Sequence, residues 1–182
     1  MGTFTINVQA KSLSEKSLTS RIALVLFLFI LGVSIAFVRD RVRIPLHMPG
    51  HHGLDVMFFL TFLRIAFPMK WSGSIMGTGA GLATFIPGMG FGDPFMPLMF
   101  FIPGLLLDLF FMGQKYFGKN IFVIAIAAGF CYMSIPMTRS VISVFGITYG
   151  SFMGGILFPF ITHFIFGMAG GFLGASFSKI IK

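Results

Sequence analysis

Residues 22–38 read IALVLFLFILGVSIAFV, an apolar run without a charged side chain. A helix needs about 20 mainly apolar residues to cross the hydrocarbon core of a bilayer. Further uncharged runs follow at Trp71–Gly92, Pro94–Leu107, Asn120–Thr138 and Ser140–Ser178. These runs are continuous, whereas a transmembrane barrel shows alternation over segments of about 10 residues. We therefore predict an all-α integral membrane protein that passes several times through the cell membrane.

The apolar runs and the turn residues between them predict six transmembrane helices. We expect these spans at 21–38, 52–69, 72–89, 95–113, 120–138 and 151–178. The last uncharged run is too long for one ordinary span, so seven helices, with a break near Pro159, are the alternative. No small-residue cleavage pattern follows the first run, which predicts an uncleaved span. Residues 1–20 are then a polar cytoplasmic N-terminal segment, and residues 21–182 form a single transmembrane helical domain.

The distribution of basic residues predicts that both termini are cytoplasmic. Loops on the cytoplasmic side carry an excess of Lys and Arg. With the N-terminus inside, the inner side receives Lys11, Lys16, Arg21, Lys70, Lys115, Lys119, Lys179 and Lys182, against Arg39, Arg41, Arg43 and Arg139 outside. The net charge of +8 is spread singly at the ends of apolar runs. Basic residues in these positions orient the spans in the membrane lipid. The pattern therefore argues against a nucleic-acid partner.

Two charged residues and several glycines fall inside the predicted spans. Ionisable residues at such depth are costly and are usually paired or functional. Arg64 and Asp108 lie at matching depths in the inner half of their spans, which predicts an ion pair, with contact to a cytoplasmic partner as the alternative. Glycines four residues apart share one helix face, as in Gly73, Gly77 and Gly81 or Gly167, Gly170, Gly171 and Gly174. We expect these faces to pack against other helices of the chain, or else against another membrane subunit.

Polar chemistry gathers in the segment RDRVRIPLHMPGHHGLD, residues 39–55, which joins the first two spans on the outer side. Arginine binds carboxylate or phosphate with a planar fork of donors. A small anionic organic molecule is therefore the predicted ligand, held at the outer ends of the helices. The candidate binding residues are Arg43, His47, His51, His52, Asp55, Asp93, Arg139 and Tyr149.

Simpler roles remain open for several of these residues. Asp93, in GMGFGDPF, has the position of a helix N-cap before proline, and Asp55 complements the positive end of its helix. Arg139 and Tyr149 are also suited to anchoring at headgroup level. His163 is expected to be buried and hydrogen-bonded, or to contact the floor of a pocket. The histidine spacing matches no recognised metal motif, so no metal or cofactor is predicted.

The chain resembles a substrate-binding S component of an energy-coupling factor (ECF) vitamin transporter. The resemblance extends over nearly all of the chain from Arg21 and rests on the predicted spans, their orientation and the long first outer loop. It also rests on the small-residue third span GSIMGTGAGLATFIPG, on FIPGLLLDLFF in the fourth and on HFIFGMAGGFLGASFSK in the last. It implies capture of a vitamin or its precursor from outside, and association with a transmembrane coupling subunit and two ATPase subunits. Members of this family that capture nickel or cobalt begin with a His near the mature N-terminus, and the start MGTFTINVQ disfavours that type here.

The sequence provides no support for catalysis. GxSxG, Walker-type and Cys/His nucleophile patterns are missing from the sequence, and no catalytic residues are predicted. The absent phosphate loop agrees with the implied S component, which has no ATPase of its own. The alternative function is a small integral subunit of a larger respiratory or oxidoreductase complex in the membrane, with helix packing as its main role. A membrane enzyme that uses the His and Asp set with a metal is the third interpretation.

Overall fold

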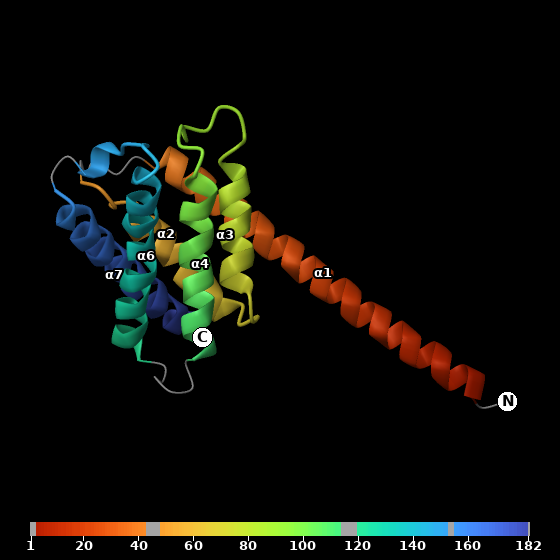
Figure 1. The fold of residues 1–182 in the computed structure, drawn as a ribbon. Coiled ribbons are helices and arrows are strands. Elements are labelled where there is room, and N and C mark those ends of the chain that lie inside the picture. The colour runs from red at the N-terminus through yellow and green to blue at the C-terminus, as the bar shows by residue number, and fades with distance from the viewer. Residues whose placement is uncertain (1–2, 43–47, 114–119, 153–154, 182) are drawn as a thin grey trace.

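The computed structural model describes residues 3–42, 48–113, 120–152 and 155–181. In these ranges the regular structure is entirely helical (Figure 1). The elements, numbered as in Figure 1, are α1 (Thr3–Arg41), α2 (Gly53–Ala66), α3 (Ser72–Ala83), α4 (Met96–Met112), α6 (Ile121–Ser143), the 3-10 helix η1 (Gly150–Phe152) and α7 (Leu157–Ile180). The predicted all-α class is confirmed for the part of the chain that is described.

Each predicted span overlaps one of these α-helices, but the boundaries differ at several points. α1 begins at Thr3 instead of residue 21, because residues 3–20 contain no proline or glycine that would end a helix. The polar first segment is therefore continuous with the first apolar helix. α3 ends at Ala83, earlier than predicted, and is followed by a turn in which Gly88 has a φ of 88°. α6 extends beyond its predicted end to Ser143.

The last uncharged run forms one α-helix, preceded by a loop that contains η1. α7 continues from Leu157 to Ile180, so a break near Pro159 is not present. Pro159 lies in the first turn of α7, where its missing N–H removes no helical hydrogen bond. Gly155, with a φ of 95°, turns the chain just before the helix. The structure therefore favours the prediction of one helix in this run over the alternative of two.

Among the described residues, three segments are long and apolar enough to cross a membrane. They are Leu18–Arg41 within α1, Ile121–Ser143 and Leu157–Ile180. α4 is a shorter apolar helix, and α2 and α3 contain only 14 and 12 residues. These lengths and compositions are compatible with a membrane protein and with a location in a membrane.

The glycines of α7 form two packing faces within the chain. A Cβ atom at Gly170 or Gly174 would meet backbone atoms of α2, while one at Gly167 or Gly171 would meet atoms of α6. Small residues let helix backbones approach closely, which is how interfaces between membrane helices are commonly built. α7 therefore lies against α2 on one side and α6 on the other, and the predicted internal packing is confirmed for this helix.

The glycines of α3 likewise allow close packing against two neighbouring helices. Gly73, Gly77 and Gly81 lie against backbone oxygens of α4, so this predicted face is also internal. Gly79 lies on another face, where a Cβ atom would meet the carbonyl oxygen of a residue in α1, and Gly32 of α1 lies reciprocally against α3. α3 is thus held between α1 and α4 by backbone approach on two sides.

Arg64 and Asp108 form the predicted ion pair, with 2.6 Å between Nε and Oδ1. Asp108 is fully buried and has a second role that the sequence did not indicate. Its carboxylate accepts hydrogen bonds from the backbone N–H groups of Gly73 (3.1 Å) and Ser74 (2.6 Å), and from the Ser74 hydroxyl (2.8 Å). These N–H groups belong to the first turn of α3, which has no side-chain cap of its own. Asp108 therefore caps α3 from α4, where a negative charge also complements the helix dipole.

The loops that follow α3 and α6 lie at the same end of the helical bundle. Figure 1 shows both loops at the top of the view, together with the C-terminal end of α1. Both chain termini lie toward the opposite end. These two loops and the end of α1 are thereby brought together at the end that carries the candidate site.

Candidate functional site

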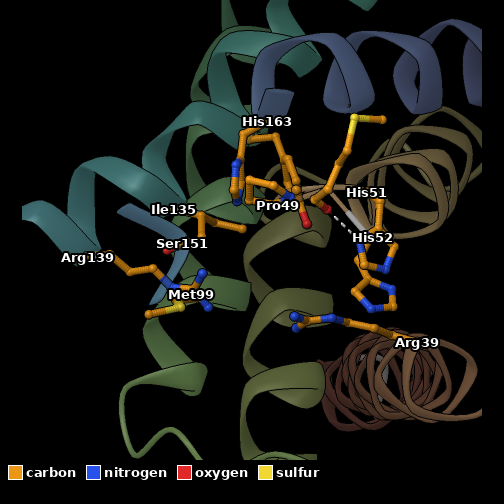
Figure 2. A pocket seen from close by; sticks show the side chains of 12 residues that line it. Arg39, Pro49, His51, His52, Met99, Ile135, Arg139, Ser151 and His163 are labelled. Carbon is orange, nitrogen blue, oxygen red and sulfur yellow. Dashed lines mark hydrogen bonds between the residues drawn. The ribbon is translucent and has the colours of Figure 1, made fainter. Parts of the chain in front are cut away.

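A cavity of about 340 Å³ lies at this end of the bundle. Its polar lining consists of Arg39, His51, His52, Tyr132, Arg139, Ser151 and His163, and its remaining lining of Met48, Pro49, Gly50, Met99 and Ile135. Figure 2 shows Arg39 from α1 and Arg139 from α6 entering from opposite sides. The described lining contains no carboxylate, so the fixed charge of the cavity is positive.

A tight turn at Gly50, before α2, brings the segment with His51 and His52 against α7. Gly50 has a φ of 83°, a conformation that glycine adopts without strain. A Cβ atom here would lie 2.6 Å from Nδ1 of His163, so the backbone and this ring are in close contact. Gly53 continues the approach, because its Cβ atom would meet the ring of Tyr132. Two glycines thus allow the chain at residues 50–53 to pack closely against α6 and α7.

Arg39 is held by aromatic and sulfur contacts. Its guanidinium carbon lies 5.2 Å from the ring centroid of Phe91 and 5.0 Å from that of Phe100. Nη1 also donates to Sδ of Met96 over 3.8 Å. Next to it, the carboxylate of Asp40 accepts a hydrogen bond of 2.8 Å from the N–H of Gly90. These contacts attach the end of α1 to the α3–α4 loop and to α4, and they orient Arg39 without forming an ion pair.

Arg139 is held on the other side of the cavity by Tyr149 and Asp93. The Arg139 guanidinium lies 5.1 Å from the Tyr149 ring centroid, and the Tyr149 hydroxyl donates to Oδ1 of Asp93 over 3.4 Å. Partial burial and the charge of Asp93 raise the pKa of Tyr149, which keeps the hydroxyl protonated as a donor. The same Asp93 oxygen accepts from the N–H of Phe95 at 2.9 Å. The predicted N-cap role of Asp93 is wrong, because α4 begins at Met96 and its N-cap is Phe95, without a side-chain cap hydrogen bond. Asp93 instead stabilises the turn just before α4.

The histidines of the cavity make local contacts. Nδ1 of His51 is 2.7 Å from the carbonyl oxygen of Met48, and the His51 and His52 rings are 4.0 Å apart. His52 Nδ1 lies 3.6 Å from Oδ2 of Asp55. His163 is buried, with Nδ1 2.7 Å from the carbonyl oxygen of a residue one turn earlier in α7. Both expected features of His163, burial with a hydrogen bond and contact with the cavity, are thus present.

The predicted site residues are partly brought together. His51, His52 and Arg139 line the cavity, whereas Tyr149 and Asp93 lie behind Arg139, and Asp55 lies behind His52. Asp55 is only 8% exposed, and neither of its carboxylate oxygens has a hydrogen-bond partner among the described residues. Arg43 and His47 fall outside the described residues.

Four polar lining residues were not among the predicted site residues. They are Arg39, Tyr132 and His163, which come from three different α-helices, and Ser151 of η1. Arg39 carried a sequence signal, because it is one of three arginines that depart from the expected charge distribution. Tyr132 and His163 are isolated in apolar runs, and only tertiary packing places their rings 5.3 Å apart in a stacked arrangement.

Substitution of Tyr149 tests how Arg139 is positioned. Tyr149→Phe removes the hydroxyl and keeps the ring, whereas Tyr149→Leu also removes the aromatic face that contacts Arg139. A cation–π contact contributes about 0.5–1 kcal/mol at an exposed site. We expect Tyr149→Leu to weaken anion binding by a few-fold more than Tyr149→Phe in isothermal titration. Equal affinities for the two variants would show that the ring does not orient Arg139.

The described residues contain no group of three or more His, Cys, Asp or Glu side chains suited to hold a metal ion. What the cavity offers instead is a set of hydrogen-bond donors on Arg, His and Tyr side chains beside thioether and aliphatic surface. Comparison with protein-family models, with curated proteins and with solved structures finds no match for this chain.

Proposed function

We propose that this protein captures a small anionic organic micronutrient at the membrane surface and acts as the S component of an ECF-type transporter. The observation that carries the proposal is the cavity between Arg39 and Arg139, which has no acidic side chain in its described lining. Ligand pockets are commonly concave and mostly apolar, with a few converging polar groups, and have volumes of about 300–1,000 Å³. The cavity lies within that range.

The chemistry of the lining favours an anion over a neutral or cationic molecule. Cations within a site bounded by apolar helices repel one another, and an entering anion relieves this repulsion. The side chains of Met48, Met99 and Ile135 offer an apolar wall to the rest of such a molecule. The ligand therefore has an acidic group and an organic body, as a vitamin or its precursor has. In this proposal the protein binds its ligand without transforming it.

We further propose that all six helices cross the cell membrane, with both termini in the cytoplasm and the cavity outside. The excess of Lys and Arg on the inner side supports this orientation. α2 and α3, with 14 and 12 residues, would extend about 21 Å and 18 Å at 1.5 Å per residue. Each is shorter than the bilayer core of about 30 Å. In this proposal, the segments flanking these two helices complete their passage, protected from lipid by neighbouring helices.

Transport by this chain requires partners that provide energy. The sequence has no Walker-type loop, so ATP hydrolysis would come from two ATPase subunits connected by a transmembrane coupling subunit. This arrangement is part of the proposal and follows from the resemblance of the sequence. If this chain is co-expressed with such subunits, we expect nutrient uptake that depends on ATP and on this chain.

Arg139→Ala tests the proposed ligand contact. We expect binding of the anionic ligand to weaken by roughly 1.5–3 kcal/mol, as is typical when a hydrogen bond to a charged group is lost. Isothermal titration of detergent-purified protein measures the effect. The matched control is Arg41→Gln, because the side chain of Arg41 is 74% exposed and does not line the cavity. Unchanged affinity in Arg139→Ala would remove Arg139 from the site.

The second candidate function is that of a small integral subunit in a larger membrane complex. One observation favours it, an apolar crevice of about 390 Å³ between α4 and α6, with Phe130 and Ile126 among its exposed lining. A helix of a partner subunit would fit such a surface. Under this function, purified protein contains no small molecule and is not stabilised by any vitamin.

A further inference from the structure

The two arginines of the cavity lack a carboxylate partner among the described residues. The ion pairs of other arginines join Arg41 to Asp40 and Arg64 to Asp108. The acidic side chains closest to the site form no ion pair with either guanidinium in the described structure: Asp55 lies 3.6 Å from His52, and Asp93 accepts from Phe95 and Tyr149. The charge of the buried Asp55 acts on Arg39 only from a distance. The Nε atoms of both Arg39 and Arg139 are buried and have no hydrogen-bond partner in the described structure.

Both arginines have aromatic rings as partners, and Arg39 also donates from Nη1 to the thioether sulfur of Met96. Phe91 and Phe100 contact Arg39, and Tyr149 contacts Arg139, at centroid distances between 5.0 and 5.2 Å. Such contacts attract the cation but do not neutralise it, and they use none of the donors in the plane of the guanidinium. Two guanidinium groups without an ion pair among the described residues therefore line one cavity, and the donors that the Met96 contact leaves free are available to its occupant (Figure 2).

We infer that the occupant carries two negative charges, as a phosphate monoester or as a dicarboxylate. This inference rests on the proposed capture function and specifies its substrate class. An anion with a single charge leaves one guanidinium uncompensated in the cavity, whereas a dianion matches both. Arginine binds either a phosphoryl group or a carboxylate through two parallel hydrogen bonds. The ring of Tyr132, stacked on His163, provides a flat surface for the organic part of the ligand.

Matched aromatic probes test the charge of the ligand. Phenyl phosphate and benzene-1,3-dicarboxylate are dianions at slightly alkaline pH, benzoate is a monoanion and benzyl alcohol is neutral. Isothermal titration of the full chain in detergent is expected to give the dianions at least about 10-fold tighter binding than benzoate, since a charged hydrogen bond contributes about 1.5–3 kcal/mol. The tighter of the two dianions identifies the source of the charge, phosphate ester or dicarboxylate.

Variants that remove one charge should abolish this preference. In Arg39→Gln and Arg139→Gln the ratio of dianion to monoanion affinity is expected to fall to about 1–3, because one charged contact is lost. Arg41→Gln removes the same charge outside the cavity and should keep the wild-type ratio. Benzoate binding by each variant reports that its cavity is intact. A variant without benzoate binding is replaced by Arg39→Lys or Arg139→Lys, which should keep part of the preference.

Failure of the inference is distinguishable from failure of the proposed function. Equal binding of benzoate and the dianions in wild-type protein overturns the dianion and leaves capture of a monoanion in place. If no probe binds, mass spectrometry of the purified protein decides. A co-purified dianion supports the inference, a co-purified monoanion or neutral molecule overturns it alone, and the absence of any small molecule overturns both.

Discussion

Asp108→Asn is expected to lower the free energy of unfolding by about 3–5 kcal/mol, the cost of breaking a buried ion pair by removing one partner. Asp108 is 0% exposed and bonds to Arg64 as well as to two N–H groups of α3. The amide would leave Arg64 without its counter-charge. Its NH₂ group would also compete with the backbone donors of α3 for the same acceptor space.

Thermal and denaturant unfolding in detergent measures this effect, and Arg64→Gln is the companion variant. In the double-mutant cycle we expect a coupling energy of about 0.5–3 kcal/mol, as found for residues in direct contact. Exchange of the two charges should not restore stability, because an arginine at position 108 cannot accept hydrogen bonds from Gly73 and Ser74. Stability of Asp108→Asn equal to that of wild type would contradict both roles of this carboxylate.

Gly79→Ala is expected to destabilise the packing of α1 on α3 by about 1–3 kcal/mol, the usual cost of overpacking. The added Cβ atom would meet the carbonyl oxygen of Phe29 in α1. Because this oxygen belongs to the backbone, the clash is relieved only if the two helices move apart. Alanine is a better helix former than glycine by about 1 kcal/mol. A measured loss of stability would therefore mean that the cost of overpacking exceeds this gain in helix propensity.

Gly92→Ala is the matched control for Gly79→Ala. A Cβ atom at Gly92 would meet nothing within 4 Å, and the backbone there does not require a positive φ. We expect its melting temperature to stay close to that of wild type. If Gly79→Ala melts at the same temperature as this control, the close approach of α1 and α3 does not exist in solution.

The fold was predictable from sequence where one physical rule decides the outcome. Apolar runs and the turn residues between them identified the six α-helices of the described residues, and the matching depths of Arg64 and Asp108 identified their ion pair. Helix ends were predicted less well, because they depend on local backbone conformation, such as the positive φ of Gly155 before α7. The capping of α3 by Asp108 was not predicted, since it depends on how α3 and α4 pack.

The site was only partly predictable. The sequence identified three of the lining residues as candidate binding residues, namely Arg139, His51 and His52. Polar residues at the end of an apolar run have few other roles. His163 and Tyr132 lie in the middle of apolar runs, where the sequence cannot distinguish a buried core residue from a cavity wall. The close approach of Gly50 and Gly53 to these rings is what assigns them to the cavity.

Native mass spectrometry of the protein purified from its membrane is the most direct test of anion capture. We expect one small acidic molecule bound to each chain, retained in Arg41→Gln and lost when Arg39 and Arg139 are both replaced by Gln. Retention of the ligand in Arg41→Gln and its loss in the double variant would show that binding depends on the charges of the cavity and not on the overall charge of the protein. Wild-type protein that contains no such molecule, and is stabilised by no anionic vitamin, would contradict the proposed function.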